Sequence, residues 1–205
     1  MKYTTAPSRS LVMSVETTLN AEDSPYRLEN PAGLPNPWVL DNYAKVLTDD
    51  RFWTYALNST VVAVLTTAMV VIFGLMAAYP LSRYRFKFRE PLYMIFVTGL
   101  LFPATVAVIP LFVIISKDLG MSNTWWGLAL PQAAFSLPLT IVILRPFLQA
   151  IPTDIEEAAF IDGAGRVSIF LRMILPLSAP GLVTVGVLAF VSSWNAYLLP
   201  LLLMQ

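Results

Sequence analysis

Residues 57–81 read LNSTVVAVLTTAMVVIFGLMAAYPL, an apolar stretch without a single charged side chain. A membrane-spanning helix needs roughly 20 consecutive, predominantly apolar residues, so this stretch is long enough to cross a bilayer. Inside hydrocarbon, a helix is the structure that satisfies all backbone hydrogen-bonding groups within one segment. The stretch therefore predicts a membrane helix and, with it, an all-α fold.

Three further runs have the same character, and each lacks Lys, Arg, Asp and Glu: residues 92–115, 125–144 and 179–204. The composition agrees, because 57% of the residues are hydrophobic, the mean hydropathy is +0.67 and 13% are charged. An average soluble domain is about 25% charged. We expect a polytopic membrane helix bundle with four spans, forming a transmembrane domain over residues 57–204.

The charged and reactive residues exclude several functions. Thirteen basic residues balance thirteen acidic ones, so a nucleic-acid partner has no support. The chain has no Cys and no His, which excludes Cys/His metal sites and the usual intramembrane hydrolases. No ionisable residue lies inside the four runs, which argues against a proton- or ion-driven secondary transporter. That class and a structural membrane protein with a partner-recruiting cytoplasmic loop stay open as alternatives.

The connecting segments predict the topology. Residues 82–90 carry four basic residues and one acid, whereas residues 116–124 carry one of each. The positive-inside rule therefore places residues 82–90 in the cytoplasm, and alternation places residues 145–178 there too. Residues 1–56 become an extracytoplasmic segment that holds a loop and, over residues 38–55, an amphipathic interfacial helix. Its Trp38, Trp53 and Tyr55 would lie at the headgroup level.

The cytoplasmic stretch 151–177 reads IPTDIEEAAFIDGAGRVSIFLRMILPL. Thr153, followed three residues later by Glu156, has the spacing of a capping box, and acids fill the next turn. We expect a short helix that begins at about Asp154 and stops at Gly163, a residue that accepts left-handed geometry. So short a helix is not stable alone in water. It packs either on this chain's own helices or on a partner, to which Glu157 and Asp162 would offer negative charge.

Residues 157–176, EAAFIDGAGRVSIFLRMILP, resemble the cytoplasmic signature (the EAA motif) of permease subunits in binding-protein-dependent ABC importers. The matching positions are Glu157, Ala158, Ala159, Gly163, Leu175 and Pro176, and Met173 replaces an Ile of the pattern. Four further segments are similar to the carbohydrate-uptake, maltose-type branch of this family: LDNYAKVL (40–47), NSTVVAV (58–64), YPLSRYRFKFR (79–89) and SSWNAYLLPLLL (192–203).

The resemblance implies a non-catalytic transport subunit of the bacterial inner membrane, and it names the partners. They are ATP-binding subunits, a second permease subunit and an extracytoplasmic solute-binding protein. The short cytoplasmic helix would be the coupling helix, with ATPase-docking residues Glu157, Ala158, Ala159 and Gly163 and, at second rank, Asp162 and Arg166. The sequence holds no Gly-x-x-x-x-Gly-Lys-Ser/Thr phosphate loop, so we expect ATP on the partner and no cofactor in this chain.

Two expectations concern the last run and the chain ends. Trp194 and Asn195 are uncharged polar groups inside the run 179–204, where they would contact a sugar on the substrate path or join helices to one another. Permeases of the resembled branch usually have six spans. We therefore expect a chain shortened at both ends, in which residues 11–14 are the tail of an earlier span.

Overall fold

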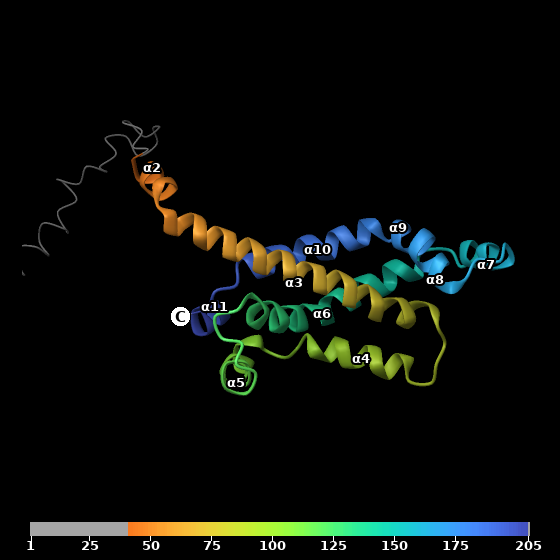
Figure 1. Cartoon of the computed structure of the whole chain (residues 1–205). Helices are drawn as coiled ribbons and strands as arrows, with labels where there is room; N and C mark the ends of the chain where they lie inside the picture. Colours follow the sequence, from red (N-terminus) through yellow and green to blue (C-terminus); the bar gives the residue numbers. More distant parts are fainter. Residues whose placement is uncertain (1–40, 205) are drawn as a thin grey trace, which may run out of the picture. The chain divides into compact units, whose positions relative to one another are not determined.

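The computed structural model describes residues 41–204, and every regular element in this part is a helix (Figure 1). The all-α prediction is confirmed there. The predicted loop within residues 1–37, the tail of an earlier span and Trp38 lie outside the described residues. The chain divides into two units, Met1–Asp49 and Asp50–Gln205.

The described part of the first unit is helix α2, Asp41–Thr48. In its last turn the hydroxyl of Thr48 donates to the backbone oxygen of Ala44 at 2.8 Å. The next helix begins at Asp50. The predicted interfacial helix over residues 38–55 is therefore interrupted at Asp49, and Trp53 and Tyr55 belong to the second unit, where both are exposed.

Helix α3, Asp50–Arg83, organises the second unit by packing along α6, Trp125–Gln149, and α10, Ala179–Trp194. Small or β-branched side chains at three- and four-residue spacing are buried on one side of it: Ala63, Thr66, Val70, Gly74 and Ala78. Small residues let neighbouring membrane helices approach closely, which strengthens dispersion contacts. Helices α3 and α6 are each long and apolar enough to span a membrane.

The predicted span 92–115 is not one straight helix. It consists of α4, Arg89–Gly99, and α5, Ala104–Val113, which continues into a π-helical turn, Ile114–Asp118. The two parts are bent by 92°. The break ends at Pro103, which has an extended backbone with ψ 114° and no N–H to continue the helix.

The remaining elements form a turn at one end of the unit and a second broken run. They are α7 (Asp154–Ile161), α8 (Arg166–Ile169), the π-helical turn Phe170–Ile174, α9 (Leu175–Leu177), α10 and α11 (Leu198–Leu203). The predicted span 179–204 is divided after Trp194. Among the described residues, up to four spans result if each bent helix pair counts as one: Arg89–Gly99 with Ala104–Asp118, and Arg166–Leu177 with Ala179–Trp194.

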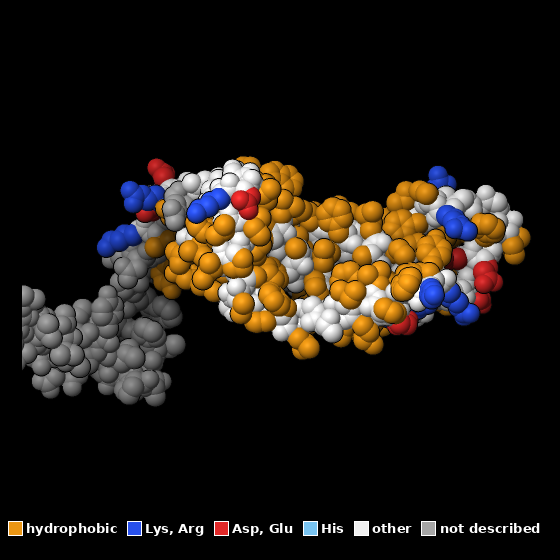
Figure 2. All heavy atoms as spheres, turned by 90° about the horizontal axis from the view of Figure 1, so that it is seen from below, with side chains coloured by type: hydrophobic (Ala, Val, Ile, Leu, Met, Phe, Trp, Pro, Cys, Tyr) orange, Lys and Arg blue, Asp and Glu red, His pale blue; other side chains and the backbone are white. Residues whose placement is uncertain are grey.

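The surface of the second unit is apolar where a soluble protein would be polar. Leu101, Ile109 and Val183 are 83%, 73% and 64% exposed. Figure 2 shows hydrophobic side chains over the middle of this unit and charged side chains toward both of its ends, including the end that carries α7. This distribution suits a body whose middle lies in lipid and whose ends lie in water.

Replacing Gly74 by alanine should destabilise the α3–α6 contact by about 1–3 kcal/mol. An added Cβ would collide with the Thr140 methyl group, and the Thr140 hydroxyl is held by the oxygen of Ser136 at 2.9 Å. Thermal unfolding in detergent measures the effect. The control is Gly186→Ala in α10, where an added Cβ would lie 3.6 Å from Val71, an ordinary contact. Equal melting temperatures for the two variants would contradict the close approach of α3 to α6 at Gly74.

Candidate functional site

Two segments that the sequence predicts on the same side of the membrane meet at one end of the second unit. Arg83, at the end of α3, contacts Glu156 of α7, and Arg145 of α6 contacts Glu90 at the start of α4. Residues 82–90 and 145–178 therefore share one end of the helix bundle. This confirms that the two segments lie together.

Helix α7 begins at Asp154 and ends at Ile161, as the sequence predicts. Gly163 follows with φ +82°, so the predicted left-handed stop is confirmed. The predicted capping box is wrong: Thr153 has helical backbone angles and its side chain makes no cap hydrogen bond. The reason lies in Glu156, whose carboxylate turns away from the cap toward α3.

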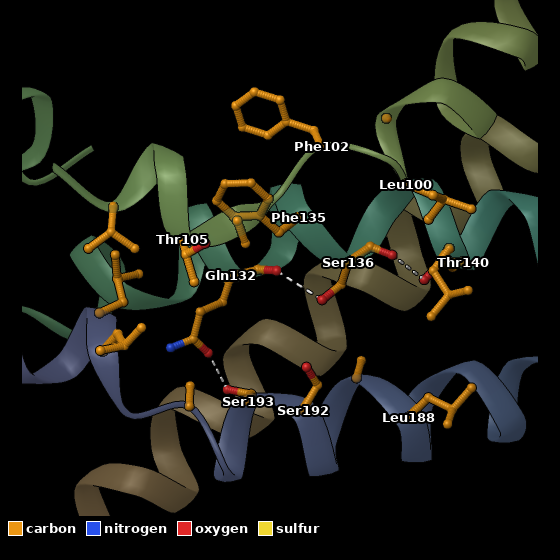
Figure 3. Close-up of a pocket in the computed structure, with 18 of the residues that line it drawn as sticks. Leu100, Phe102, Thr105, Gln132, Phe135, Ser136, Thr140, Leu188, Ser192 and Ser193 are labelled. Carbon is orange, nitrogen blue, oxygen red and sulfur yellow. Dashed lines mark hydrogen bonds between the residues drawn. The ribbon is translucent and has the colours of Figure 1, made fainter. Parts of the chain in front are cut away.

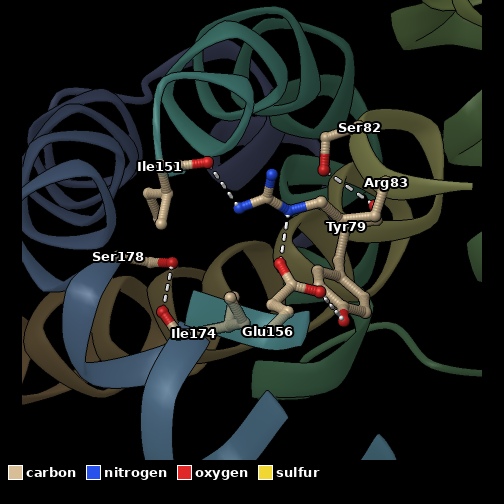
Figure 4. Close-up of polar contacts among 7 residues, drawn as sticks. All are labelled: Tyr79, Ser82, Arg83, Ile151, Glu156, Ile174 and Ser178. Carbon is tan, nitrogen blue, oxygen red and sulfur yellow. Dashed lines mark hydrogen bonds and ion pairs between the residues drawn. The ribbon is translucent and has the colours of Figure 1, made fainter. Parts of the chain in front are cut away.

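The Glu156 carboxylate lies between two side chains of α3 (Figure 4). Its Oε1 atom is 2.7 Å from Nε of Arg83, an ion pair whose N–H is not aligned as a hydrogen bond. Its Oε2 atom accepts a hydrogen bond from the Tyr79 hydroxyl at 3.3 Å. Nη2 of Arg83 donates to the backbone oxygen of Ile151 at 3.0 Å. Arg83 and Tyr79 thus hold both the turn before α7 and its first turn.

Most of the predicted docking residues are exposed at this end, and one is not. The exposed ones are Glu157, Ala158, Asp162, Gly163 and Arg166. Ala159 is 3% exposed and packs in a core cluster with Leu75, Leu144 and Ile174. The two alanines of the signature therefore do not share one exposed face. Docking itself stays a prediction.

An exposed apolar surface on α7 adds residues that the sequence reasoning did not select for docking. Phe160 is 61% exposed and Ile161 is 85% exposed. A hollow of about 440 Å³ adjoins them and is also lined by Tyr79, Tyr84 and Arg166. In the sequence, the available signal for this surface was the presence of two large apolar residues, Phe160 and Ile161, beside acids in a charged segment.

Arg145 is the second buried cation at this end. It is 7% exposed, makes a charge-assisted hydrogen bond to Glu90, and its guanidinium lies 4.0 Å from the centre of the Tyr93 ring. The sequence predicted only the side of the membrane on which residues 145–178 lie and gave Arg145 no further role. Its role in the structure is to join α6 to α4.

A cavity of about 470 Å³ lies among the α4–α5 break, α6 and α10 (Figure 3). None of its lining residues is charged. Its polar lining comes from one amide and several hydroxyl groups: Gln132, Thr105, Ser136, Thr140, Ser192, Ser193 and Tyr197. The Ser193 hydroxyl donates to the Gln132 side-chain oxygen, whereas the buried Gln132 nitrogen has no hydrogen-bond partner.

The two residues predicted for the substrate path lie beside this cavity and do not line it. Trp194 ends α10 and stacks on Phe190 with ring centres 5.9 Å apart. The side-chain nitrogen of Asn195, the residue after α10, donates to the backbone oxygen of Val191 in that helix at 2.9 Å. Gln132, a polar residue within an apolar run, was the available sequence signal for the cavity.

Metal-binding geometry is missing from residues 41–204: no group of three or more Asp or Glu side chains is placed to hold an ion. The arrangement of this part offers two features of functional interest. One is the acidic and apolar surface of α7, and the other is the uncharged cavity between helices.

These features define a multi-pass helical membrane protein. The chain belongs to the family described as "Binding-protein-dependent transport system inner membrane component", whose sequence model matches residues 70–205. This match confirms the family resemblance that residues 157–176 indicate. It also confirms the prediction that the chain is a multi-pass component of the inner membrane.

Similar proteins agree with this assignment. The diacetylchitobiose uptake system permease protein NgcG of Streptomyces coelicolor is 40% identical over 86% of this chain and 58% of its own length. The trehalose transport system permease protein SugB of Mycobacterium tuberculosis is 39% identical over 82% and 61%. The chain thus spans about three fifths of the length of these relatives.

A solved structure also shares the fold. It is a crystal structure of a bacterial ABC transporter involved in the import of the acidic polysaccharide alginate. The match has a TM-score of 0.74 at 28% identity and covers 98% of this chain and 78% of that chain.

Replacing Gly163 by alanine should loosen α7, because a left-handed backbone costs an L-residue about 1–2 kcal/mol. We expect amide hydrogen exchange in Asp154–Ile161 to rise about 5- to 30-fold, the factor equivalent to that energy. Gly165→Ala is the matched control, because Gly165 has φ −70°, an angle outside the left-handed region. At Gly163 and at Gly165 alike, an added Cβ would meet open space. Unchanged exchange in the Gly163 variant would contradict the predicted strain.

Proposed function

We propose that this protein is the membrane-spanning permease subunit of an ATP-driven importer for carbohydrates. The observation that carries the proposal is α7, a short helix with exposed acidic and apolar side chains at the Arg-rich end of a membrane bundle. The family supports it, since its description is that of a binding-protein-dependent transport component. Relatives named for diacetylchitobiose and trehalose transport support a carbohydrate as the solute.

In this proposal, energy comes from separate ATP-binding subunits. Helix α7 docks into a cleft of such a subunit, where Phe160 and Ile161 bury apolar area and Glu157 and Asp162 meet basic groups. Apolar anchors surrounded by complementary charge are the usual basis of a specific interface. This chain lacks a phosphate loop, so the partner binds ATP and this chain needs no cofactor.

The proposed orientation follows from charge. Residues 82–90 and α7 face the cytoplasm, because basic loops stay on that side. The first unit, Met1–Asp49, is then extracytoplasmic. A solute-binding protein delivers the solute on that side, and a second permease subunit completes the path through the membrane.

The cavity is the part of the path that this chain contributes. Its lining offers hydroxyl groups and an amide but no charge. Such a lining suits a neutral, polyhydroxylated solute, because hydrogen bonds replace those that the solute loses on leaving water. Gln132 brings a side-chain amide to this lining, although its nitrogen is buried and has no hydrogen-bond partner.

Charge reversal on α7 tests docking. Glu157→Lys should reduce the amount of ATPase that co-purifies in detergent by at least about tenfold, since like charges at an interface cost several kcal/mol. The control is Asp118→Lys, which makes the same charge reversal on an exposed acid. Asp118 lies in the segment predicted for the opposite side of the membrane. This variant should retain the ATPase. Equal retention by both inserted variants would refute docking through α7.

Filling the cavity tests the solute path. Ser192→Phe places a large ring in the cavity and should lower solute uptake at least about tenfold, because the barrier rises by more than about 1.4 kcal/mol. Val191→Phe adds the same ring one residue away, outside the cavity lining, and should leave uptake near wild type. Both variants should retain the ATPase. Normal uptake by the Ser192 variant would place the path elsewhere.

A further inference from the structure

We infer that Glu156 and Arg83 are positioning residues that transmit movement between the docked helix α7 and the membrane helix α3. The inference rests on the proposed function and assigns different tasks to two adjacent glutamates. Glu157 faces outward toward the ATPase, whereas Glu156 faces inward and fixes α7 to the bundle.

Few contacts join α7 to α3. Helix α7 packs chiefly on α8, its neighbour in the chain. It reaches α3 through the buried Ala159, which shares a core cluster with Leu75, and through the Glu156 carboxylate. This carboxylate lies 2.7 Å from Arg83 Nε and 3.3 Å from the Tyr79 hydroxyl. The Glu156 carboxylate is therefore the polar link from α7 to α3, and it lies beside the apolar packing of Ala159.

The ion pair between these two helices is shielded from water. The Arg83 side chain is 6% exposed and that of Glu156 is 20% exposed, so the solvent screens their attraction poorly. Removing one partner leaves the other as a buried charge without compensation, which is strongly unfavourable. The pair is therefore a stiff link, in contrast to an exposed surface pair of small net value.

The link has two attachment points on the α7 side. Besides contacting Glu156, Arg83 donates to the backbone oxygen of Ile151 at 3.0 Å (Figure 4). Ile151 belongs to the turn between α6 and α7. A planar guanidinium holding both points restricts rotation of α7 as well as its distance from α3.

Helix α3 connects this link to the cavity. It packs along α6 and α10, both of which line the cavity. A displacement of the Arg83 end of α3 therefore acts on the two helices that enclose the proposed solute path. The link thus joins the docking surface to the cavity by a continuous series of packed elements.

The first test uses the chain by itself. The sequence has no Cys, so cysteines introduced at Ile161 in α7 and Ile72 in α3, 85% and 54% exposed, carry the only spin labels. In detergent, Glu156→Gln and Arg83→Gln should broaden the measured distance distribution. The charge exchange Arg83→Glu with Glu156→Arg should narrow it in part, because it restores the ion pair but not the hydrogen bond to the Ile151 oxygen. Arg85→Gln, an exposed cation two residues away, is the matched control and should change nothing.

The second test uses the assembled transporter in proteoliposomes. Glu156→Gln should retain the ATPase but raise the ATP hydrolysed per solute imported by at least about fivefold, the lower end of typical coupling factors. The charge exchange should reduce this ratio again. Because docking and coupling are read separately, a loss of ATPase binding like that of Glu157→Lys would overturn the inference by making Glu156 a docking residue.

The outcomes separate the inference from the proposed function. If the wild-type assembly imports no solute, the proposed function fails, and the distance measurement still decides whether the pair fixes α7 to α3. If the wild type transports and the single variants keep both the wild-type distance distribution and the wild-type ratio, the link does not exist and the inference is overturned.

Discussion

The close packing of α3 against α6 and α10 is the contact on which the rest of the structure depends. Lipid tails are as apolar as the helices, so association relies on dispersion contacts and interhelical hydrogen bonds. The buried small side chains of α3, with Gly74 against Thr140, supply such contacts along its length. Since α3 also ends in Tyr79 and Arg83, the helix that organises the bundle is the one that holds α7.

Polar interactions are arranged around this apolar packing in two different ways. At the end that carries α7, the buried cations Arg83 and Arg145 are each paired with a carboxylate from another element. In the middle, uncharged groups such as Gln132 and Ser193 bond to each other beside the cavity. Full charges thus occur as pairs at the end of the bundle, and uncharged dipoles line its middle, as the desolvation cost of each requires.

The sequence predicted what depends on local pattern. Apolar runs indicated the helical segments, basic loops indicated the shared end, and Gly163 indicated the end of α7. It did not predict which proline interrupts a helix: Pro131 and Pro138 lie inside α6, whereas Pro103 ends a break. Tertiary surroundings decide this. Nor did it predict the partner of Glu156, because residues far apart in the chain meet only after packing; Tyr79 and Glu156 are 77 positions apart.

The break between α4 and α5 has a mechanical consequence. A continuous helix resists bending because its backbone hydrogen bonds must lengthen or open. Here α4 ends at Gly99 and α5 begins at Ala104, so rotation about the intervening backbone changes their angle without opening a hydrogen bond inside either helix. Phe102 and Thr105, which line the cavity, lie at this joint. The angle between α4 and α5, and with it the width of the cavity, is therefore set by the backbone torsions near Phe102 and Pro103 rather than by a continuous helix.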